Sequence, residues 1–330
     1  MADPLLSVRN LTTAFATDRG QAIAVDDVSL TVAPGEALGV IGESGSGKSV
    51  AALSILGLLA RPPARVLAGQ AWFEGEDLLA LPARRLRQIR GRRIGMIFQE
   101  PMTSLNPVLP IGEQIAETVR LHQALGAEAA RRRAVDLLDR VGIASAARRV
   151  DDYPHQLSGG MRQRAMIAIA LACSPTLLIA DEPTTALDVT VQAQILDLLR
   201  DLQRDMGMAV LLITHNIGVI ADFADRVVVM YAGRVCETAP VEAIFDSPRH
   251  PYTSGLLAAA PALDHRRPRL QTIPGTLPDP TDRSLGCRFA PRCPLAEPAC
   301  AADRPPELSL AAEHSTACRR TDLRADWSAQ

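Results

Sequence analysis

Short, purely apolar segments recur along the chain and predict the strands of a buried sheet. Five of them are rich in Val, Ile and Leu without alternation: Ala37–Ile41, Ile94–Phe98, Leu177–Ala180, Val210–Ile213 and Val227–Met230. Strands buried on both faces of a mostly parallel sheet have this pattern. Such a sheet needs covering helices, and apolar positions at helical spacing predict one from Thr190 to Met206.

Other segments complete an α/β organisation. Three short strand-like runs between turn residues predict a small antiparallel region: Leu5–Val8, Val28–Val32 and Ala71–Glu74. Helical patterns without a strand between residues 101 and 174 predict a helical insertion. After Phe245 frequent prolines interrupt the helix and strand patterns, and only a short helix at Thr253–Ala260 is expected. We therefore expect a loop-rich tail.

Composition limits the classes of function. The chain has 330 residues, 47% of them hydrophobic and 22% charged, with a net charge of -2, which disfavours bulk disorder and general binding of polyanions. Aromatic residues make up only 3%, so base-stacking platforms, and nucleic acid as a partner, are not expected. The start MADPLLSVRN lacks a secretory pattern and no apolar run is long enough to span a membrane, so we expect a cytosolic location.

A glycine-rich segment after the first apolar strand carries the strongest chemical signal. Gly42-Glu43-Ser44-Gly45-Ser46-Gly47-Lys48-Ser49 fits the phosphate-loop pattern G-x-x-x-x-G-K-S/T. Its backbone N–H groups and the following helix end should face phosphate oxygens, Lys48 adds a full positive charge, and the Ser49 hydroxyl can bind magnesium. A simple turn before a helix is the alternative, and the strand, helix and Lys-Ser pair together disfavour it. The expected nucleotide-binding residues are Gly42, Ser44, Gly45, Gly47, Lys48 and Ser49.

Two adjacent carboxylates end the buried run that begins at Leu177. We expect Asp181 to hold magnesium through its water shell and Glu182 to orient or deprotonate the attacking water, because phosphoryl transfer needs a positioned nucleophile and charge neutralisation. His215, which closes the strand Val210–Thr214, could touch a γ-phosphate. Taken alone, a solvated strand end and a structural histidine are the alternatives.

A serine followed by two glycines precedes another predicted helix. Ser158 is a natural N-cap for the helix that runs to Ala172, and Gly159 and Gly160 leave backbone N–H groups accessible. An ordinary helix cap explains this segment equally well when it is considered alone.

The motifs taken together resemble the nucleotide-binding subunit of an ABC transporter, over about residues 5 to 250. They occur in the order Gly42–Ser49, Gln99, Leu157–Met161, Leu178–Glu182, Ala186-Leu187-Asp188 and His215. The resemblance implies an ATPase with a P-loop NTPase core, ATP and Mg2+ as cofactors, and a head-to-tail dimer. Each ATP would lie between one subunit's phosphate loop and Ser158, Gly159 and Gly160 of the other. It further implies that Gln99 links magnesium and water to the membrane-facing surface, that Asp188 contacts the opposite subunit, and that Phe15 stacks on adenine.

Four further sequence segments narrow the resemblance to ATP-binding subunits of oligopeptide/dipeptide (and nickel) permeases. It is carried by Glu100–Pro107, Tyr153-Pro154-His155, Asp188–Gln192 and His250–Thr253. The implied domains are an ATPase domain at 1–250, with a helical subdomain at about 101–174, and an extension at 251–330. The implied activity is ATP-powered import of oligopeptides, dipeptides or a related small solute. The implied partners are a second ATPase subunit, identical or related, two transmembrane permease subunits and, indirectly, an extracytoplasmic solute-binding protein, with the chain peripheral on the cytoplasmic face.

Four cysteines in the tail indicate a metal site. Cys287, Cys293, Cys300 and Cys318 have the spacing C-x5-C-x6-C-x17-C, and four thiolates suit either iron–sulfur or zinc. The C-x2-C knuckle typical of structural zinc is missing, and the resemblance implies a 4Fe-4S cluster. Zinc remains the alternative ligand.

Two other functions share these motifs. A soluble ABC machine acting on nucleic acid or in iron–sulfur assembly would be expected to carry a coiled coil, a second ATPase domain or a basic arm, which the sequence lacks. A catalytically inactive regulatory partner would be expected to lack Lys48, Glu182 or the Ser158 segment, and all three are present.

Overall fold

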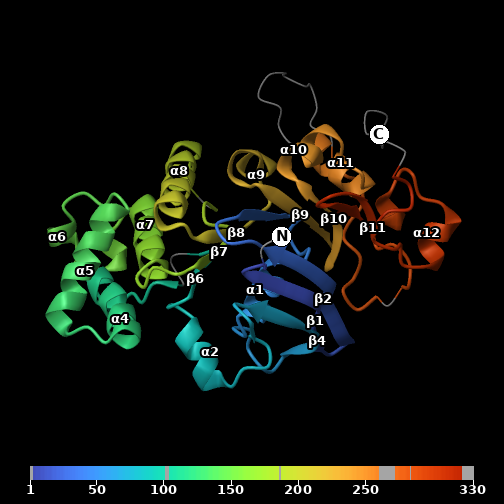
Figure 1. Ribbon diagram of the computed structural model, residues 1–330. Helices are drawn as coiled ribbons and strands as arrows, with labels where there is room; N and C mark the ends of the chain where they lie inside the picture. The colour runs from blue at the N-terminus through green and yellow to red at the C-terminus, as the bar shows by residue number, and fades with distance from the viewer. Residues whose placement is uncertain (1–2, 101–103, 186, 260–271, 283, 322–330) are drawn as a thin grey trace. The chain divides into compact units, whose positions relative to one another are not determined.

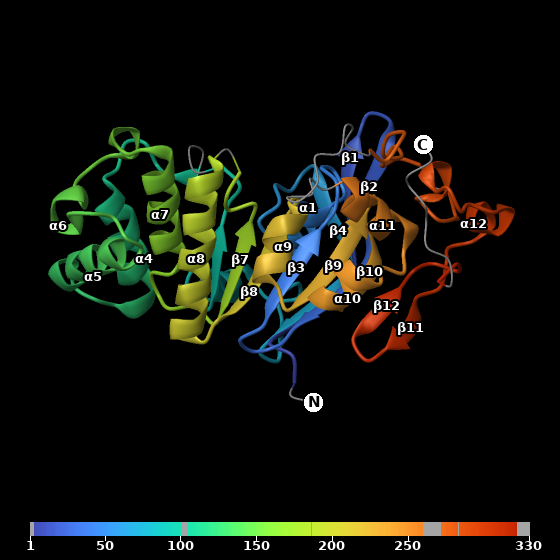
Figure 2. The same cartoon turned by 90° about the horizontal axis from the view of Figure 1, so that it is seen from above.

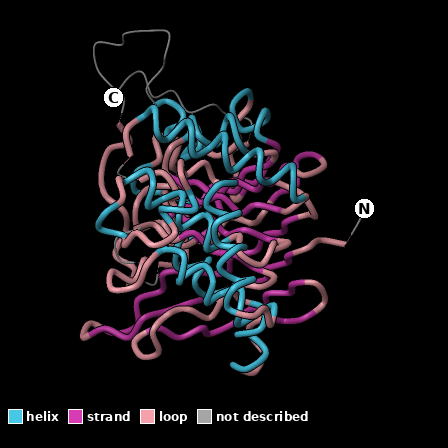
Figure 3. The backbone as a smooth tube through the Cα atoms, turned by 90° about the vertical axis from the view of Figure 1, so that its left-hand side faces the viewer, coloured by secondary structure: helices cyan, strands magenta, loops and turns pink. Residues whose placement is uncertain are grey.

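The computed structural model describes residues 3–100, 104–185, 187–259, 272–282 and 284–321. They form two compact units: the first includes Leu81–Ile213, and the second includes Leu6–Val32, Ala37–Ala80 and the chain from Thr214. Residues 101–103 and 186, which belong to motifs named above, lie outside the described residues, as does Ala260, the expected end of the tail helix. Helices, strands and loops alternate along the chain, as in other α/β proteins (Figure 3).

Three parallel strands form the sheet of the first unit. They are β6 (Ile94–Ile97), β7 (Leu177–Asp181) and β8 (Ala209–Thr214). Ile94 pairs with Leu177, and Leu177 with Ala209, so the strands run in register from the same edge. Every residue of β7 and β8 is buried, which explains their unbroken apolar sequences and confirms the parallel-sheet prediction.

The described chain between β6 and β7 contains helices joined by loops. The helices of the first unit are α2 (Ala83–Ile89), α4 (Ile111–Gln123), α5 (Ala127–Arg140), α6 (Ala146–Arg149), η1 (Pro154–Gln156), α7 (Gly159–Ala170) and α8 (Val189–Met206). Helices α4, α5 and α7 pack on one another, and α7 also contacts β6 and α8 (Figures 1 and 2). Helix α7 therefore connects the helical segment to the sheet.

Helix α8 shows how local sequence sets these boundaries. The Asp188 side chain accepts a hydrogen bond from the Val191 N–H at 2.9 Å and caps the first turn. Gly207 ends the helix at φ 59°, a left-handed conformation that glycine adopts without steric cost. Between them Ile195, Leu199 and Leu202 are buried. Each such side chain stabilises the fold by about 1.5–3 kcal/mol.

The second unit contains an antiparallel sheet of four strands in the order β2-β1-β4-β5. Its strands are β1 (Leu6–Thr17), β2 (Gly20–Val32), β4 (Ala64–Phe73) and β5 (Glu76–Asp77). The predicted strand Val28–Val32 falls within β2, whereas Leu5–Val8 overlaps β1 from Leu6 onward and Ala71–Glu74 overlaps β4 as far as Phe73. All three predictions are too short, because these strands extend through polar residues of the turns and bulges.

A second group of strands in this unit runs in the order β11-β12-β10-β9-β3. They are β3 (Ala37–Ile41), β9 (Arg226–Tyr231), β10 (Arg234–Pro240), β11 (Leu308–Ala311) and β12 (His314–Thr316). The helices of this unit are α1 (Lys48–Ile55), α9 (Ile217–Phe223), α10 (Val241–Asp246), α11 (Pro251–Ala259), η2 (Ala290–Arg292) and α12 (Pro298–Ala302). The loop-rich tail thus contributes two strands that its sequence did not predict, and β12 pairs with β10. Across the described residues no helix combines the length and apolar character needed to cross a bilayer.

Candidate functional site

The phosphate-loop sequence joins a buried strand to a helix, as predicted. Strand β3 ends at Ile41 and α1 begins at Lys48, both in the second unit. Gly47 lies at φ 98°, and a Cβ atom there would be 2.3 Å from the Ala24 carbonyl oxygen. The loop therefore packs so closely on β2 that only glycine fits at this position.

The Lys48 side chain contacts the backbone of the phosphate loop. Its Nζ donates hydrogen bonds to the carbonyl oxygens of Gly42 at 2.7 Å and Glu43 at 3.0 Å. The side chain is almost fully buried, with 5% of the residue exposed. Phosphate loops bind a triphosphate through backbone N–H groups and such a lysine, whose ammonium group here contacts two carbonyl oxygens of the loop.

The two carboxylates follow β7 in the first unit. Asp181 is the last residue of β7 and is buried, whereas Glu182 adopts a left-handed conformation at φ 47° and is half-buried. The Glu182 N–H donates to the Ile213 carbonyl at 2.8 Å, which fixes the turn at the end of the strand. A non-glycine residue held at positive φ is a strained position of the kind that gathers at functional sites.

Gln99 and Glu182 are brought together although 83 residues separate them. The Gln99 Nε2 donates to one Glu182 carboxylate oxygen at 3.0 Å, and the Thr185 hydroxyl donates to the same oxygen at 2.8 Å. An amide and a hydroxyl therefore orient the carboxylate. The sequence predicted a role for Gln99 and Glu182 but gave no signal for Thr185.

The segment from Leu157 begins α7 with its capping serine exposed. Leu157 is buried, and the Ser158 hydroxyl oxygen accepts a hydrogen bond from the Met161 N–H at 3.3 Å. Gly159 is also exposed, and a Cβ at Gly160 would meet Val191 of α8 at 3.0 Å. The predicted N-cap is confirmed, and Ser158 and Gly159 at this helix start are exposed to solvent.

The remaining predicted nucleotide contacts are Phe15, His215 and Asp188. Phe15 is half-buried on β1, where it pairs with Ala22 and Ala64. His215 is exposed and directly follows β8. Asp188 is exposed and caps α8 of its own chain.

The four tail cysteines line one small cavity in the second unit. Its volume is about 20 Å³, and His250, Pro251, Phe289, Ala290, Leu295 and Arg320 complete the lining. All four thiols are free and half-buried, and burial raises the pKa of Cys293 to about 11. Within the described part of the chain, no three His, Cys, Asp or Glu side chains are placed closely enough to bind a metal ion. The cysteines converge, but their thiol groups do not form a closed metal site in this conformation.

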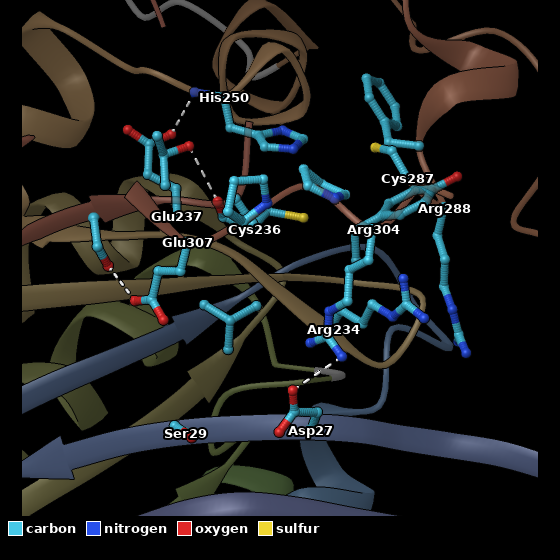
Figure 4. Close-up of a pocket in the computed structure, with 18 of the residues that line it drawn as sticks. Asp27, Ser29, Arg234, Cys236, Glu237, His250, Cys287, Arg288, Arg304 and Glu307 are labelled. Atoms are coloured by element: carbon cyan, nitrogen blue, oxygen red, sulfur yellow. Dashed lines mark hydrogen bonds and ion pairs between the residues drawn. The ribbon is translucent and has the colours of Figure 1, made fainter. Parts of the chain in front are cut away.

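A larger cavity of about 300 Å³ lies next to Cys287 (Figure 4). Cys287 and His250 line both cavities. Arg234 and Arg288 line the larger one, and both donate to the carboxylate of Asp26 at 2.8 Å. Glu237 is fully buried in its wall and accepts hydrogen bonds from the Arg249 and His250 N–H groups. Sequence reasoning could not find the Asp26 pairs, because 208 and 262 positions separate Asp26 from Arg234 and Arg288.

Comparisons with known proteins agree with the motifs. Residues 25–185 match the family described as "ABC transporter", and residues 236–300 match "Oligopeptide/dipeptide transporter, C-terminal region". A "Putative peptide import ATP-binding protein" of Brucella abortus (strain 2308) is 56% identical over 315 residues, covering 96% of this chain and 94% of the relative. A protein of the same description from Brucella melitensis is 53% identical over 328 residues, covering 96% and 97%.

Two solved structures extend the comparison to the fold. An ATP-binding cassette determined as a dimer in a post-hydrolysis state with ADP and Pi has a TM-score of 0.64 and 30% identity, covering 72% of this chain and 98% of that one. The cbiO1 protein from Clostridium perfringens, part of an ABC transporter complex, has a TM-score of 0.62 and 27% identity, covering 74% and 91%. This chain therefore belongs to the family of ABC transporter ATP-binding proteins, in the group that carries the oligopeptide/dipeptide transporter C-terminal region.

Proposed function

We propose that this chain is the ATP-hydrolysing subunit that powers the import of oligopeptides or dipeptides through partner membrane subunits. The observation that carries the proposal is the identity of more than half the residues with a peptide import ATP-binding protein over 96% of this chain. The buried strand, glycine-restricted loop and enclosed Lys48 provide the matching phosphate site. An ABC machine acting on nucleic acid or in iron–sulfur assembly finds no support in these relatives.

The residues of the phosphate loop fit ATP with Mg2+. In this proposal Gly42, Ser44, Gly45 and Gly47 surround the phosphates, and Lys48 exchanges its loop carbonyls for phosphate oxygens. Bound magnesium neutralises the charge that develops during phosphoryl transfer. Ser49, Gln99 and Asp181 would hold it, Phe15 would stack on the adenine, and His215 would contact the γ-phosphate.

Glu182 is the proposed residue that orients or deprotonates the attacking water. Support comes from its carboxylate, which Gln99 and Thr185 fix through hydrogen bonds to one oxygen. A general base must be held within hydrogen-bonding reach of the proton that it removes, and two donors to one oxygen restrict its rotation. Gln99 would thereby couple the position of the water to the segment after β6.

A second ATPase subunit would complete each nucleotide site. Ser158, Gly159 and Gly160 lie at an exposed helix start, where backbone N–H groups favour anions. We assign them, with Asp188, to contact across the dimer. Closure around ATP and reopening after hydrolysis would drive two transmembrane permease subunits, fed by an extracytoplasmic solute-binding protein. The chain would lie peripherally on the cytoplasmic face of the membrane.

For the cysteine cavity we retain the 4Fe-4S cluster as the proposed occupant, with zinc as the alternative. Support comes from the convergence of Cys287, Cys293, Cys300 and Cys318 on one cavity. Because no closed metal group exists among the described side chains, the proposal requires the thiols to approach one another on binding. An anaerobic preparation with about 4 Fe per chain and absorption near 400 nm would support the cluster, whereas stoichiometric zinc without iron would replace it.

The transport proposal is tested with the complete transporter in proteoliposomes. ATP-dependent uptake of labelled di- to pentapeptides is expected with the wild-type chain and not with Lys48→Ala, because the phosphate-facing charge is lost. Peptide uptake that is unchanged in Lys48→Ala would contradict the ATP site. ATP hydrolysis that no peptide stimulates and that moves no peptide would contradict the transported class.

A further inference from the structure

Arg292 of the C-terminal extension binds a side chain of the phosphate loop. Arg292 donates from Nη1 to one Glu43 carboxylate oxygen at 2.7 Å and from Nη2 to the other at 3.0 Å. Glu43 is the second residue of the phosphate loop, and 249 positions separate the two side chains. Both residues belong to the second unit.

The other hydrogen bonds of the Arg292 guanidinium group also go to protein atoms. Its Nε donates to the Pro274 carbonyl at 2.8 Å, Nη2 to the Ile273 carbonyl at 3.0 Å, and Nη1 to the Tyr231 hydroxyl at 3.3 Å. With the two bonds to Glu43, these use all five N–H donors of an arginine. Arg292 is only 8% exposed, so its position is fixed by the surrounding chain rather than by solvent.

A second contact from the same extension reaches the same loop residue. The Glu43 backbone N–H donates to the Tyr252 hydroxyl at 2.8 Å, and Tyr252 is fully buried on α11. The Tyr252 ring packs against Tyr231 and Phe289, with centroids 4.7 Å and 5.3 Å away. The extension therefore holds both the backbone and the side chain of Glu43.

The negative charge of Glu43 explains why its pairing with Arg292 matters for nucleotide binding. A carboxylate within the phosphate loop repels a triphosphate unless a cation compensates it. Arg292 is a delocalised cation with a fork that matches both carboxylate oxygens, and its bonds leave neither oxygen unengaged. Lys48 bonds the Glu43 carbonyl from the other side, so displacement of Glu43 would also disturb the phosphate-binding lysine.

We propose that Arg292 is a positioning residue for ATP binding, which neutralises Glu43 and fixes the phosphate loop so that the affinity for ATP depends on the C-terminal extension. The inference rests on the proposed function only in taking the phosphate loop as the ATP site. Arg292 directly precedes Cys293, so the cavity lined by the four cysteines and the ATP site share one short structural connection.

The test is a double-mutant cycle on the ATP affinity of the full-length chain. Arg292→Gln removes the charge but keeps amide donors for the neighbouring carbonyls, and should weaken ATP binding by about 5- to 150-fold, the range usual for coupling between two sites. Glu43→Gln removes the carboxylate and serves as the reference background of the cycle. In the Glu43→Gln background, Arg292→Gln should have almost no further effect, because no carboxylate is left to compensate.

Controls separate this role from a structural one. Arg320→Gln removes another paired arginine of the extension, which donates to Glu297 at 3.0 Å and has no contact with the phosphate loop, and should leave ATP affinity unchanged. Thermal melts establish the folded fraction of each variant, and the loss should appear in the Kd and KM for ATP rather than in kcat. Should Arg292→Gln alone fail to fold, Arg292→Lys, which keeps the charge and loses the fork, replaces it in the cycle: weaker ATP binding with Glu43 but not with Glu43→Gln supports the proposal, and wild-type affinity in both backgrounds contradicts it.

Two results would overturn it. One is wild-type ATP affinity in folded Arg292→Gln, and the other is the same loss of affinity with and without Glu43. Lys48→Ala distinguishes the levels of failure: if it abolishes ATP binding while Arg292→Gln does not alter it, only this inference fails. If Lys48→Ala also binds ATP normally, the assignment of the ATP site fails.

Discussion

Ser158 offers a perturbation that separates the stability of α7 from the proposed contact with ATP. Two substitutions differ in the property that matters: Ser158→Ala removes the cap, whereas Ser158→Asp keeps a capping oxygen and adds a negative charge. Aspartate and serine cap helices about equally well. If the segment only caps α7, activity should follow stability in both variants.

The structure sets the size of the stability effect. A lost N-cap costs about 0.5–2 kcal/mol, and the Ser158–Met161 hydrogen bond is long at 3.3 Å and exposed, so we expect about 0.5–1 kcal/mol for Ser158→Ala. Ser158→Asp should not lower the free energy of unfolding, because a carboxylate at a helix start is favourable by about 0.3–1 kcal/mol. Urea titrations measure both values.

ATP hydrolysis should be affected in the opposite order, with the larger loss in Ser158→Asp. A carboxylate about 4 Å from a phosphate charge is opposed by about 4 kcal/mol at the effective dielectric of a protein surface, which corresponds to a loss on the order of 1000-fold. Phosphate release by the assembled transporter should therefore fall far more in Ser158→Asp than in Ser158→Ala. Normal phosphate release by a stably folded Ser158→Asp variant would refute the contact across the dimer.

Two further predictions concern the loop and α8. Gly47→Ala should destabilise the chain by at least about 1–2 kcal/mol and weaken ATP binding, because the new Cβ would lie 2.3 Å from the Ala24 carbonyl oxygen. Gly75→Ala is the control for the backbone conformation alone, because Gly75 also has a positive φ but lies in open space. Calorimetric titration and thermal melts that do not distinguish these variants would count against the close packing. Asp188→Asn should keep the free energy of unfolding, whereas Asp188→Ala should lower it by about 1 kcal/mol through loss of the α8 cap. Equal stability in the two would show that the cap contributes nothing.

Regular structure with a strong periodic pattern was predictable. The strand Ala37–Ile41 has the predicted bounds, because a fully apolar run lies between Gly35-Glu36 and the glycine of the phosphate loop. Helix α8 was predicted within one residue for a similar reason, since its cap and its apolar face agree. Strand β10 was missed because it includes Glu237 and Thr238 and ends at Pro240, a composition that does not indicate a strand.

Hydrophobic periodicity could not predict contacts between segments that are distant along the chain. Glu43 was only a variable position of the phosphate-loop pattern, and Arg292 was one of many arginines, yet they form a bidentate pair. Likewise, the pattern of the cysteines predicted that they would gather, but not that His250 would line the same cavity. Motifs fix the residue types that a site needs, whereas the packing of the whole unit decides which other residues support them.

Phosphate release by Glu182→Gln tests the central claim most directly. In the assembled transporter with Mg2+ and labelled ATP, this variant should bind ATP with wild-type affinity, because no phosphate-facing charge is lost, while phosphate release falls by on the order of 100-fold or more. Wild-type phosphate release by Glu182→Gln would contradict the assignment of the reactive carboxylate, and with it the mechanism of ATP hydrolysis proposed for this chain.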